Sequence, residues 1–387
     1  MHRRYFVQGA TALTISQLLV GCSHNNTSKL TVKFLRNSLP GQVVEKFRQS
    51  LKSQAKLEFS LEGQLGDIFQ QLQNWQEKKE PQAKQGWNLP LGQPEPQVAD
   101  LVTVGDYWLK SAIEQKLIQP LDVSKLQNWS KLPPKWQNLV RRNEKGEIDS
   151  QGKIWGAPYR WGTTVIVYNR EKLKSLGIQP QDWDDLWRKE LGDRISLLDQ
   201  PREVIGLTLK KLGKSYNTTK LSTVSNLETE LKALHQQTKF YSSTRYLEPL
   251  LIGDTWLAVG WSNEVLPFIN RYPQFTAFVP KSGTSLWADI WVKPGNPSAQ
   301  EQKNLAATNL PDQWIDFCWS DNIAQTISLL TRANSPIPVS IDQKNISSAL
   351  RNVLMADATT LNQSEFILPL AANVSQEYGE FFEKMQA

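Results

Sequence analysis

Tryptophan and carboxylate side chains occur close together at several points of this sequence. The chain has 15 tryptophans among its 387 residues. In Trp287-Ala288-Asp289 the two outer side chains lie on the same side of an extended chain, because side chains alternate along a strand. A tryptophan face attracts a cation by about 0.5–2 kcal/mol, and a carboxylate accepts charge-assisted hydrogen bonds from an ammonium group. This pair predicts a site for an amine; the alternative is that Trp287 is a core residue and Asp289 a helix cap or surface charge.

Three further residues of these types stand at the expected ends of strands and helices. Trp261 closes a strand pattern, and Asp199 and Glu203 flank the start of a helix pattern. In open α/β sheets, ligand sites form at the carboxyl ends of strands. We therefore expect Trp261, Asp199 and Glu203 to approach the site that contains Trp287 and Asp289.

The sequence lacks the residue patterns of common enzymes and metal centres. It contains no Gly-x-Ser-x-Gly, no glycine-rich phosphate loop with lysine and no Cys/His nucleophile pair. The chain has three histidines and two cysteines. Cys318 lies in an aromatic helix pattern, where a thiol is expected to be a core residue. We predict no cofactor, no metal and no enzymatic activity; the alternative is acid/base chemistry by Asp199 or Glu203.

The charge and hydropathy of the chain limit its partners. The net charge is +6, but the basic residues are scattered, which indicates a solvated surface and no nucleic-acid face. The mean hydropathy is −0.45. After the first 21 residues no apolar run approaches the roughly 18–20 residues that a membrane helix needs.

Strand and helix patterns alternate along the chain. Alternating or continuous apolar residues predict strands, and apolar residues at three- and four-residue spacing predict helices. The expected strands cover 30–35, 57–59, 98–104, 165–168, 195–198, 257–261 and 276–279. The expected helices cover 43–51, 65–75, 109–117, 171–176, 201–212 and one or two helices in 312–330. Asp106 is expected to cap the third of these helices. This order predicts an α/β fold with mixed, mostly parallel sheets and flanking helices.

The N-terminus has the features of an export signal. Residues 1–21 combine the basic pair Arg3-Arg4, a short apolar stretch and small residues before a cleavage point, as in a signal peptide. The arginine pair resembles the twin-arginine export signal. Leu19-Val20-Gly21-Cys22 resembles the bacterial lipobox, which predicts lipidation of Cys22 and a flexible tether over 22–28.

Four segments resemble the bacterial spermidine/putrescine-binding proteins. Ala157-Pro158-Tyr159-Arg160-Trp161-Gly162 is similar to the Ile-Pro-Tyr-x-Trp-Gly segment of that family. The other three segments run from Trp183 to Trp187, from Leu197 to Val204 and from Lys281 to Asp289. The resemblance covers most of 98–340.

This resemblance implies a two-lobe periplasmic-binding-protein fold that closes on a solute and delivers it to an ABC permease in the inner membrane. It also implies roles for particular residues. Glu203, Trp261, Trp287 and Asp289 fall where the family holds the ammonium groups and alkyl chain of a polyamine. Tyr107 falls on an aromatic lining position.

The chain departs from the family pattern at three places. The aromatic box on the first strand is replaced by Arg36 and its neighbours, which removes one wall of a polyamine clamp and puts a positive charge there. The family's aspartate before the helix at 201–212 is Gln200, with Asp199 one residue earlier. A tyrosine near the later proline-rich turn is replaced by Asn334.

The resemblance also suggests how the chain divides between the lobes. Crossings near Ala157, Asp289 and Ser340 assign 29–157 and 289–340 to lobe 1, and 158–288 and 341–387 to lobe 2. Residues 78–97 are rich in Pro, Gly and Gln, which predicts an exposed inserted loop in lobe 1.

Three functions remain open from the sequence. The first is a lipid-anchored receptor on the periplasmic face of the cell membrane that binds a polyamine-like amine for an ABC importer. The second is a receptor for another solute, such as a sugar, an amino-acid derivative or an organic acid, for which Arg36 would suit a carboxylate. The third is a scaffold or regulatory lipoprotein that docks a partner through 78–97.

Overall fold

The computed structural model describes residues 28–52, 54–77, 98–295, 309–339, 348–355 and 357–387. Several expectations fall on other residues. The signal peptide, Cys22, the tether up to residue 27, the insertion at 78–97 and the crossing near Ser340 lie outside the described residues. Within the described residues, no helix combines the length and the apolar character of a membrane span.

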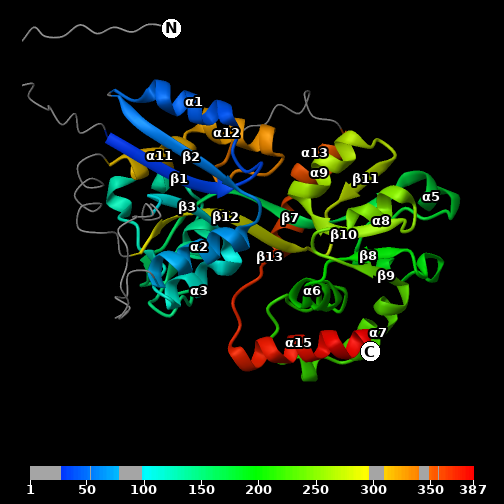
Figure 1. The fold of residues 1–387 in the computed structure, drawn as a ribbon. Helices are drawn as coiled ribbons and strands as arrows, with labels where there is room; N and C mark the ends of the chain where they lie inside the picture. The colour runs from blue at the N-terminus through cyan, green and yellow to red at the C-terminus, as the bar shows by residue number, and fades with distance from the viewer. Residues whose placement is uncertain (1–27, 53, 78–97, 296–308, 340–347, 356) are drawn as a thin grey trace, which may run out of the picture.

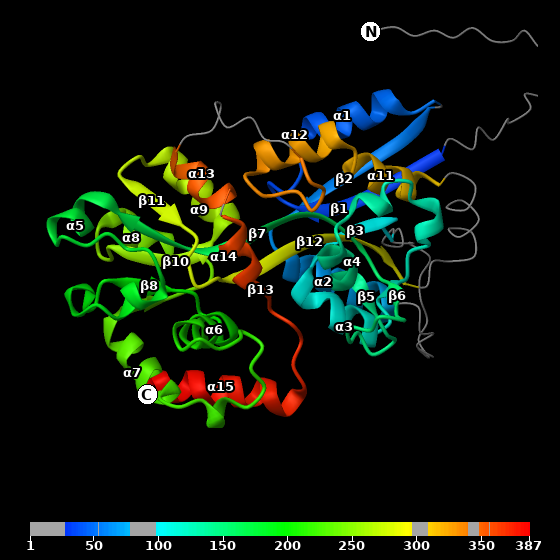
Figure 2. The same ribbon diagram turned by 180° about the vertical axis from the view of Figure 1, so that it is seen from behind.

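The described chain forms two α/β lobes that lie side by side and are joined by two long strands, β7 (Ala157–Asn169) and β12 (Ser285–Pro294) (Figures 1 and 2). Lobe 1 contains β1 (Ser28–Leu35), α1 (Gly41–Ser50), β2 (Ala55–Glu62), α2 (Leu65–Glu77), β3 (Leu101–Gly105), α3 (Leu109–Glu114), β4 (Ile118–Gln119), α4 (Pro134–Val140), β5 (Arg141–Arg142), β6 (Lys153–Ile154), α11 (Leu310–Cys318) and α12 (Asp321–Thr331). Lobe 2 contains α5 (Arg170–Ser175), β8 (Ile195–Leu197), α6 (Pro201–Lys211), α7 (Leu227–Gln237), β9 (Thr238–Tyr241), α8 (Leu247–Ile252), β10 (Leu257–Trp261), α9 (Ser262–Arg271), β11 (Phe275–Phe278), α13 (Ser348–Leu354) and α15 (Ala372–Gln386).

The strands form one hydrogen-bonded path through both lobes, in the order β2-β1-β3-β12-β7-β10-β8-β9. Pairing is parallel within the outer parts of each lobe, between β1 and its neighbours β2 and β3 and between β8 and its neighbours β9 and β10. It is antiparallel where β12 pairs with β3 and β7, and where β7 pairs with β10 and β11. The first half of β7 pairs with β12 and its second half pairs with β10, so a single strand belongs to both lobes.

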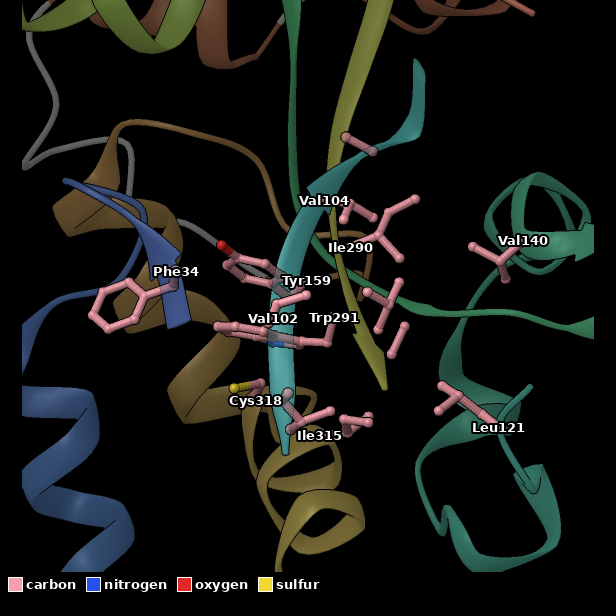
Figure 3. Close-up of a cluster of buried hydrophobic side chains, with 14 of the residues drawn as sticks. Phe34, Val102, Val104, Leu121, Val140, Tyr159, Ile290, Trp291, Ile315 and Cys318 are labelled. Atoms are coloured by element: carbon pink, nitrogen blue, oxygen red, sulfur yellow. The ribbon is translucent and has the colours of Figure 1, made fainter. Parts of the chain in front are cut away.

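The cores of the two lobes are separate hydrophobic clusters. The buried β7 residues of the lobe 1 cluster end at Tyr159, with the partly buried Trp161 packed against that cluster, whereas the clusters of lobe 2 take β7 residues from Val165 onwards. In lobe 1 the rings of Tyr159 and Trp291 stack with centroids 4.2 Å apart. Figure 3 shows these rings beside Cys318, which is a buried core residue as expected; its burial raises the pKa of the thiol.

The C-terminal segment makes a further connection between the lobes. The strand β13 (Glu365–Phe366) pairs with β12, and Phe366 is buried in the hydrophobic cluster of lobe 1. The chain then continues into α15, which packs on α6 and α7 of lobe 2 (Figure 1). A helix α14 (Ala358–Gln363) precedes β13.

Most of the expected elements are present, with shifts of a few residues. The helix α6 begins at Pro201, whose fixed φ suits a first turn, and Gly213 follows it with a φ of +67°. The strand expected at 165–168 is the second half of the much longer β7. The expected cap is wrong: Asp106 opens a short 3-10 helix without capping it, and its carboxylate accepts a hydrogen bond from the backbone of Ala288 at 2.9 Å.

Candidate functional site

One face of the paired strands β7 and β12 carries most of the candidate residues. The antiparallel register places Asp289 opposite Arg160 and Trp287 opposite Gly162. Because side chains alternate along a strand, every second residue shares this face. We call the resulting set the β7–β12 row; it consists of Arg160, Gly162 and Thr164 on β7 and Ser285, Trp287 and Asp289 on β12.

Gly162 has a packing role in this row. A Cβ atom at Gly162 would lie 2.3 Å from Cζ2 of Trp287 and 2.3 Å from Oγ of Ser262. The indole ring therefore occupies the space that any other residue at position 162 would need. The Oγ of Ser262 also accepts a hydrogen bond from the backbone of Thr163 at 3.1 Å, which ties the start of α9 to β7.

Asp289 forms a buried ion pair at one end of the row. Nε of Arg160 donates to Oδ2 of Asp289 at 2.5 Å, and the two side chains are only 2% and 3% exposed. The guanidinium carbon lies 5.6 Å from the centroid of the Trp287 ring, within cation–π range. Burial raises the pKa of Asp289, and the adjacent Arg160 opposes that shift. The positive charge that contacts both Trp287 and Asp289 is therefore the guanidinium of Arg160, a side chain of the protein itself.

Glu203 lies at the other end of the row, in the first turn of α6. Its carboxylate accepts hydrogen bonds from Oγ of Ser285 at 2.7 Å, from Oγ1 of Thr164 at 3.1 Å and from Nε1 of Trp261 at 3.2 Å. All three donors are neutral, and among the described residues no ion pair to Glu203 is found. Burial raises the pKa of Glu203, and these hydrogen bonds oppose the shift.

The two carboxylates define the ends of an elongated site. Glu203 contacts Ser285, which is four residues before Asp289 on β12. At about 3.3 Å per residue, this separation is roughly 13 Å along the strand. Trp287 lies between the two ends, and Nε1 of its indole is buried without a hydrogen-bond partner among the described residues. The row thus presents a carboxylate at each end and an aromatic ring between them.

The structure brings together four of the eight candidate residues. Glu203 and Trp261 share a hydrogen bond, and Trp287 and Asp289 share the row with them. The others are exposed, and no hydrogen bond or ion pair within the described chain connects their side chains to the row; they are Arg36, Tyr107, Asp199 and Gln200.

Asn334, one of the positions that depart from the family pattern, has a structural role. The backbone of Asn334 exchanges hydrogen bonds with that of Trp161, at 2.7 and 2.8 Å, which fixes the turn after α12 against β7. Tyr107 is 55% exposed and makes an edge contact with Trp108. Asp106 is buried near the Asp289 end of the row, and burial raises its pKa to about 7.

Sequence reasoning missed Arg160, Thr164 and Ser285. Arg160 carried a signal, because it is a charged residue inside the long apolar strand β7, and a buried charge requires a partner. The identity of that partner depends on a pairing across 129 residues of sequence. Thr164 and Ser285 are small polar residues in buried strands, and no sequence signal separates them from other such residues.

Comparison with known proteins matches the chain to a family of solute-binding proteins. A family model described as bacterial extracellular solute-binding protein matches residues 96–357. The spermidine/putrescine-binding periplasmic protein of Escherichia coli is 27% identical over 290 residues, which cover 74% of this chain and 77% of that protein. The putrescine-binding periplasmic protein PotF of Escherichia coli is 29% identical over 218 residues, which cover 52% of this chain and 57% of that protein.

A solved structure confirms the fold. The spermidine/putrescine ABC transporter substrate-binding protein PotD from Streptococcus pneumoniae superimposes with a TM-score of 0.74 at 18% identity, over 93% of this chain and 99% of that chain. The expected two-lobe periplasmic-binding fold is therefore confirmed. Since the family match spans more than half of the sequence, the chain belongs to the bacterial extracellular solute-binding proteins.

Proposed function

We propose that this protein is the receptor of an ABC importer and binds a small amine-bearing solute in a cleft between its lobes, with the ammonium group at Glu203. The single observation that carries this proposal is the environment of Glu203. A buried carboxylate is costly unless a cation is paired with it. Glu203 accepts three hydrogen bonds from neutral groups and takes part in no ion pair within the described chain.

The hydrogen bonding of Glu203 leaves one acceptor position for an ammonium group. A carboxylate offers about four acceptor positions, and three of those on Glu203 are used. The indole of Trp261 lies beside it and is partly exposed, so its face is available to a cation or an alkyl chain. The names of the relatives, which bind spermidine and putrescine, agree with an amine ligand.

Isothermal calorimetry tests the proposal directly. We expect at least one member of a panel of primary amines, diamines and polyamines to bind the wild type, and Glu203→Gln to lose about 2–5 kcal/mol of binding free energy, because the buried ammonium loses its charged partner. Glu264→Gln, a carboxylate of the same lobe that accepts from Tyr246 outside the row, is the control and should bind normally. If a sugar binds and no amine does, the proposed amine ligand is wrong and the solute is neutral.

We also propose that the mature protein is anchored to the membrane by a lipid on Cys22 and exported by the twin-arginine route. The support is the sequence around Arg3-Arg4 and Leu19-Val20-Gly21-Cys22. The wild type should fractionate with membranes and carry an acyl mass on Cys22, whereas Cys22→Ser should be released or left uncleaved. If export continues after both arginines are changed to lysine, the twin-arginine route is wrong, but the lipid anchor on Cys22 is not affected by that result.

The division of the chain between the lobes is kept as part of this proposal. It assigns 29–157 and 289–340 to lobe 1, and 158–288 and 341–387 to lobe 2. The change of hydrophobic cluster along β7 supports a crossing in that strand.

A further inference from the structure

The Arg160 side chain places a cation beside both an aromatic ring and a carboxylate. Its guanidinium lies 5.6 Å from the centroid of the Trp287 ring and is hydrogen-bonded to Asp289 at 2.5 Å. An aromatic face together with a carboxylate is the arrangement that recognises an ammonium group. Here the arrangement is satisfied from within the chain, by a residue directly opposite Asp289 in the strand register.

This position is fixed by the surrounding structure. Arg160 is 2% exposed and lies in the middle of β7, with its backbone in the ladder between the two long strands. Its removal from the site would break a buried ion pair and leave Asp289 without its partner, which is a large cost in a protein interior. A solute therefore meets Arg160 in place.

The charges at the two ends of the row consequently differ. At the Asp289 end, the carboxylate of Asp289 is paired with the guanidinium of Arg160. Burial raises the pKa of the nearby Asp106 to about 7, so that this second carboxyl is partly protonated at neutral pH. A second cation would be brought against the positive charge of Arg160. At the Glu203 end, the carboxylate has three neutral donors and no ion pair with a described residue. Burial raises the pKa of Glu203 and the neighbouring Arg202 opposes this shift through space, but the guanidinium of Arg202 donates to the carbonyls of Leu368 and Tyr216 and to the side chain of Asn217. The Glu203 carboxylate therefore has no direct cationic partner within the described chain and can offer its charge to a ligand.

We infer that this receptor selects solutes with one ammonium group, held at Glu203, whose other end is uncharged and lies against Trp287 and the Arg160–Asp289 pair. Solutes with a charged group at both ends, such as diamines and polyamines, are disfavoured. Arg160 is then the specificity-determining residue of the site. This inference rests on the proposed function, because it needs an amine at Glu203.

The test compares 8-amino-1-octanol with 1,8-diaminooctane, two solutes of similar length that are long enough to reach from one end of the row toward the other and carry one and two ammonium groups. Calorimetry on the wild type should show a preference for 8-amino-1-octanol of about tenfold or more, because like charges in a closed site oppose binding. Arg160→Met frees Asp289 and should reverse the preference by about the same factor. Arg160→Lys retains the positive charge and should still prefer 8-amino-1-octanol.

Each result either supports the inference or overturns it. Equal binding of the two solutes by the wild type would overturn it while leaving the amine receptor intact. A folded Arg160→Met that gains no binding of 1,8-diaminooctane would also overturn it. If Arg160→Met fails to fold, Arg160→Gln, which can still donate a hydrogen bond to Asp289, decides the outcome by the same criterion. If no variant binds any amine, the proposed function fails and this inference fails with it.

Discussion

Loss of either member of the Arg160–Asp289 pair is expected to destabilise the unliganded protein by about 3–5 kcal/mol, because the remaining charge stays buried without a partner. The structure supports the upper part of that range. The two side chains are 2% and 3% exposed, and their joined atoms are 2.5 Å apart. A globular protein is typically stable by about 5–15 kcal/mol, so Asp289→Asn alone would remove a large share.

The double variant separates the pair from its surroundings. If Asp289→Asn and Arg160→Met acted independently, together they would cost about 6–10 kcal/mol, the sum of the two single effects. Because each single change strands a charge and the double change strands none, we expect the double variant to be no less stable than either single one. The coupling free energy, which is the sum of the single effects minus the effect of the double change, should therefore be at least about 3 kcal/mol.

Urea unfolding followed by tryptophan fluorescence measures these differences, at neutral pH and without ligand. The exposed pair of Arg245 and Glu248, with side chains 67% and 57% exposed, provides a matched control. Its cycle should give a coupling of about 1 kcal/mol or less, because solvent screens surface pairs. Additivity of the Arg160 and Asp289 changes within about 0.5 kcal/mol would refute the reasoning.

Three further predictions concern other parts of the site. Burial raises the pKa of Glu203 above its ordinary value of about 4.5. Between that value and the raised pKa, Glu203 is protonated in the native state but ionised in the unfolded chain. The free energy of unfolding therefore falls as pH rises through this window. In Glu203→Gln the urea midpoint should fall less steeply with pH above about 4.5 than in the wild type. An unchanged slope of midpoint against pH would contradict a raised pKa of Glu203. Gly162→Ala should lower the free energy of unfolding by about 1–3 kcal/mol and displace the Trp287 indole, since the added Cβ would lie 2.3 Å from the ring. Thermal unfolding measures this loss. Gly41→Ala, where no atom lies within 4 Å of the added Cβ, is the control. A bound amine should reduce the radius of gyration measured by small-angle scattering, as hinge closure does, and an unchanged radius at saturation would indicate a rigid site.

The sequence predicted local features well and long-range contacts poorly. The start of α6 at Pro201 and the strand β10 were predicted from patterns within a few residues. The contact between Glu203 and Trp261 was anticipated because both were placed at the ends of elements that converge in α/β sheets. These predictions need only periodicity, capping preferences and general topology.

The failures have a common physical origin. Asp106 has the chemistry of a helix cap, but its carboxylate binds the backbone of Ala288, 182 residues away. The partner of Asp289 is set by the register between β7 and β12, and a shift of one residue would put Arg160 on the opposite face of the sheet. Neither pairing leaves a trace in local sequence, so the partners of Asp106 and Asp289 could be identified only from the folded chain.

The strands β7 and β12 have a mechanical consequence for the specificity of the receptor. They hold the β7–β12 row and they also join the lobes, so a rotation of one lobe against the other would bend the ladder that carries the proposed ligand contacts. A change of side chain within this ladder would then alter the balance between open and closed forms together with the contacts, and the apparent affinity would depend on both. Glu203 and Trp261 approach the row from α6 and from the end of β10. Substitutions on the lobe 2 side, at Glu203 and Trp261, would therefore change the ligand preference with the least effect on the free energy of lobe closure. The two strands would set the free energy of closure, and the lobe 2 residues would set the choice of ligand.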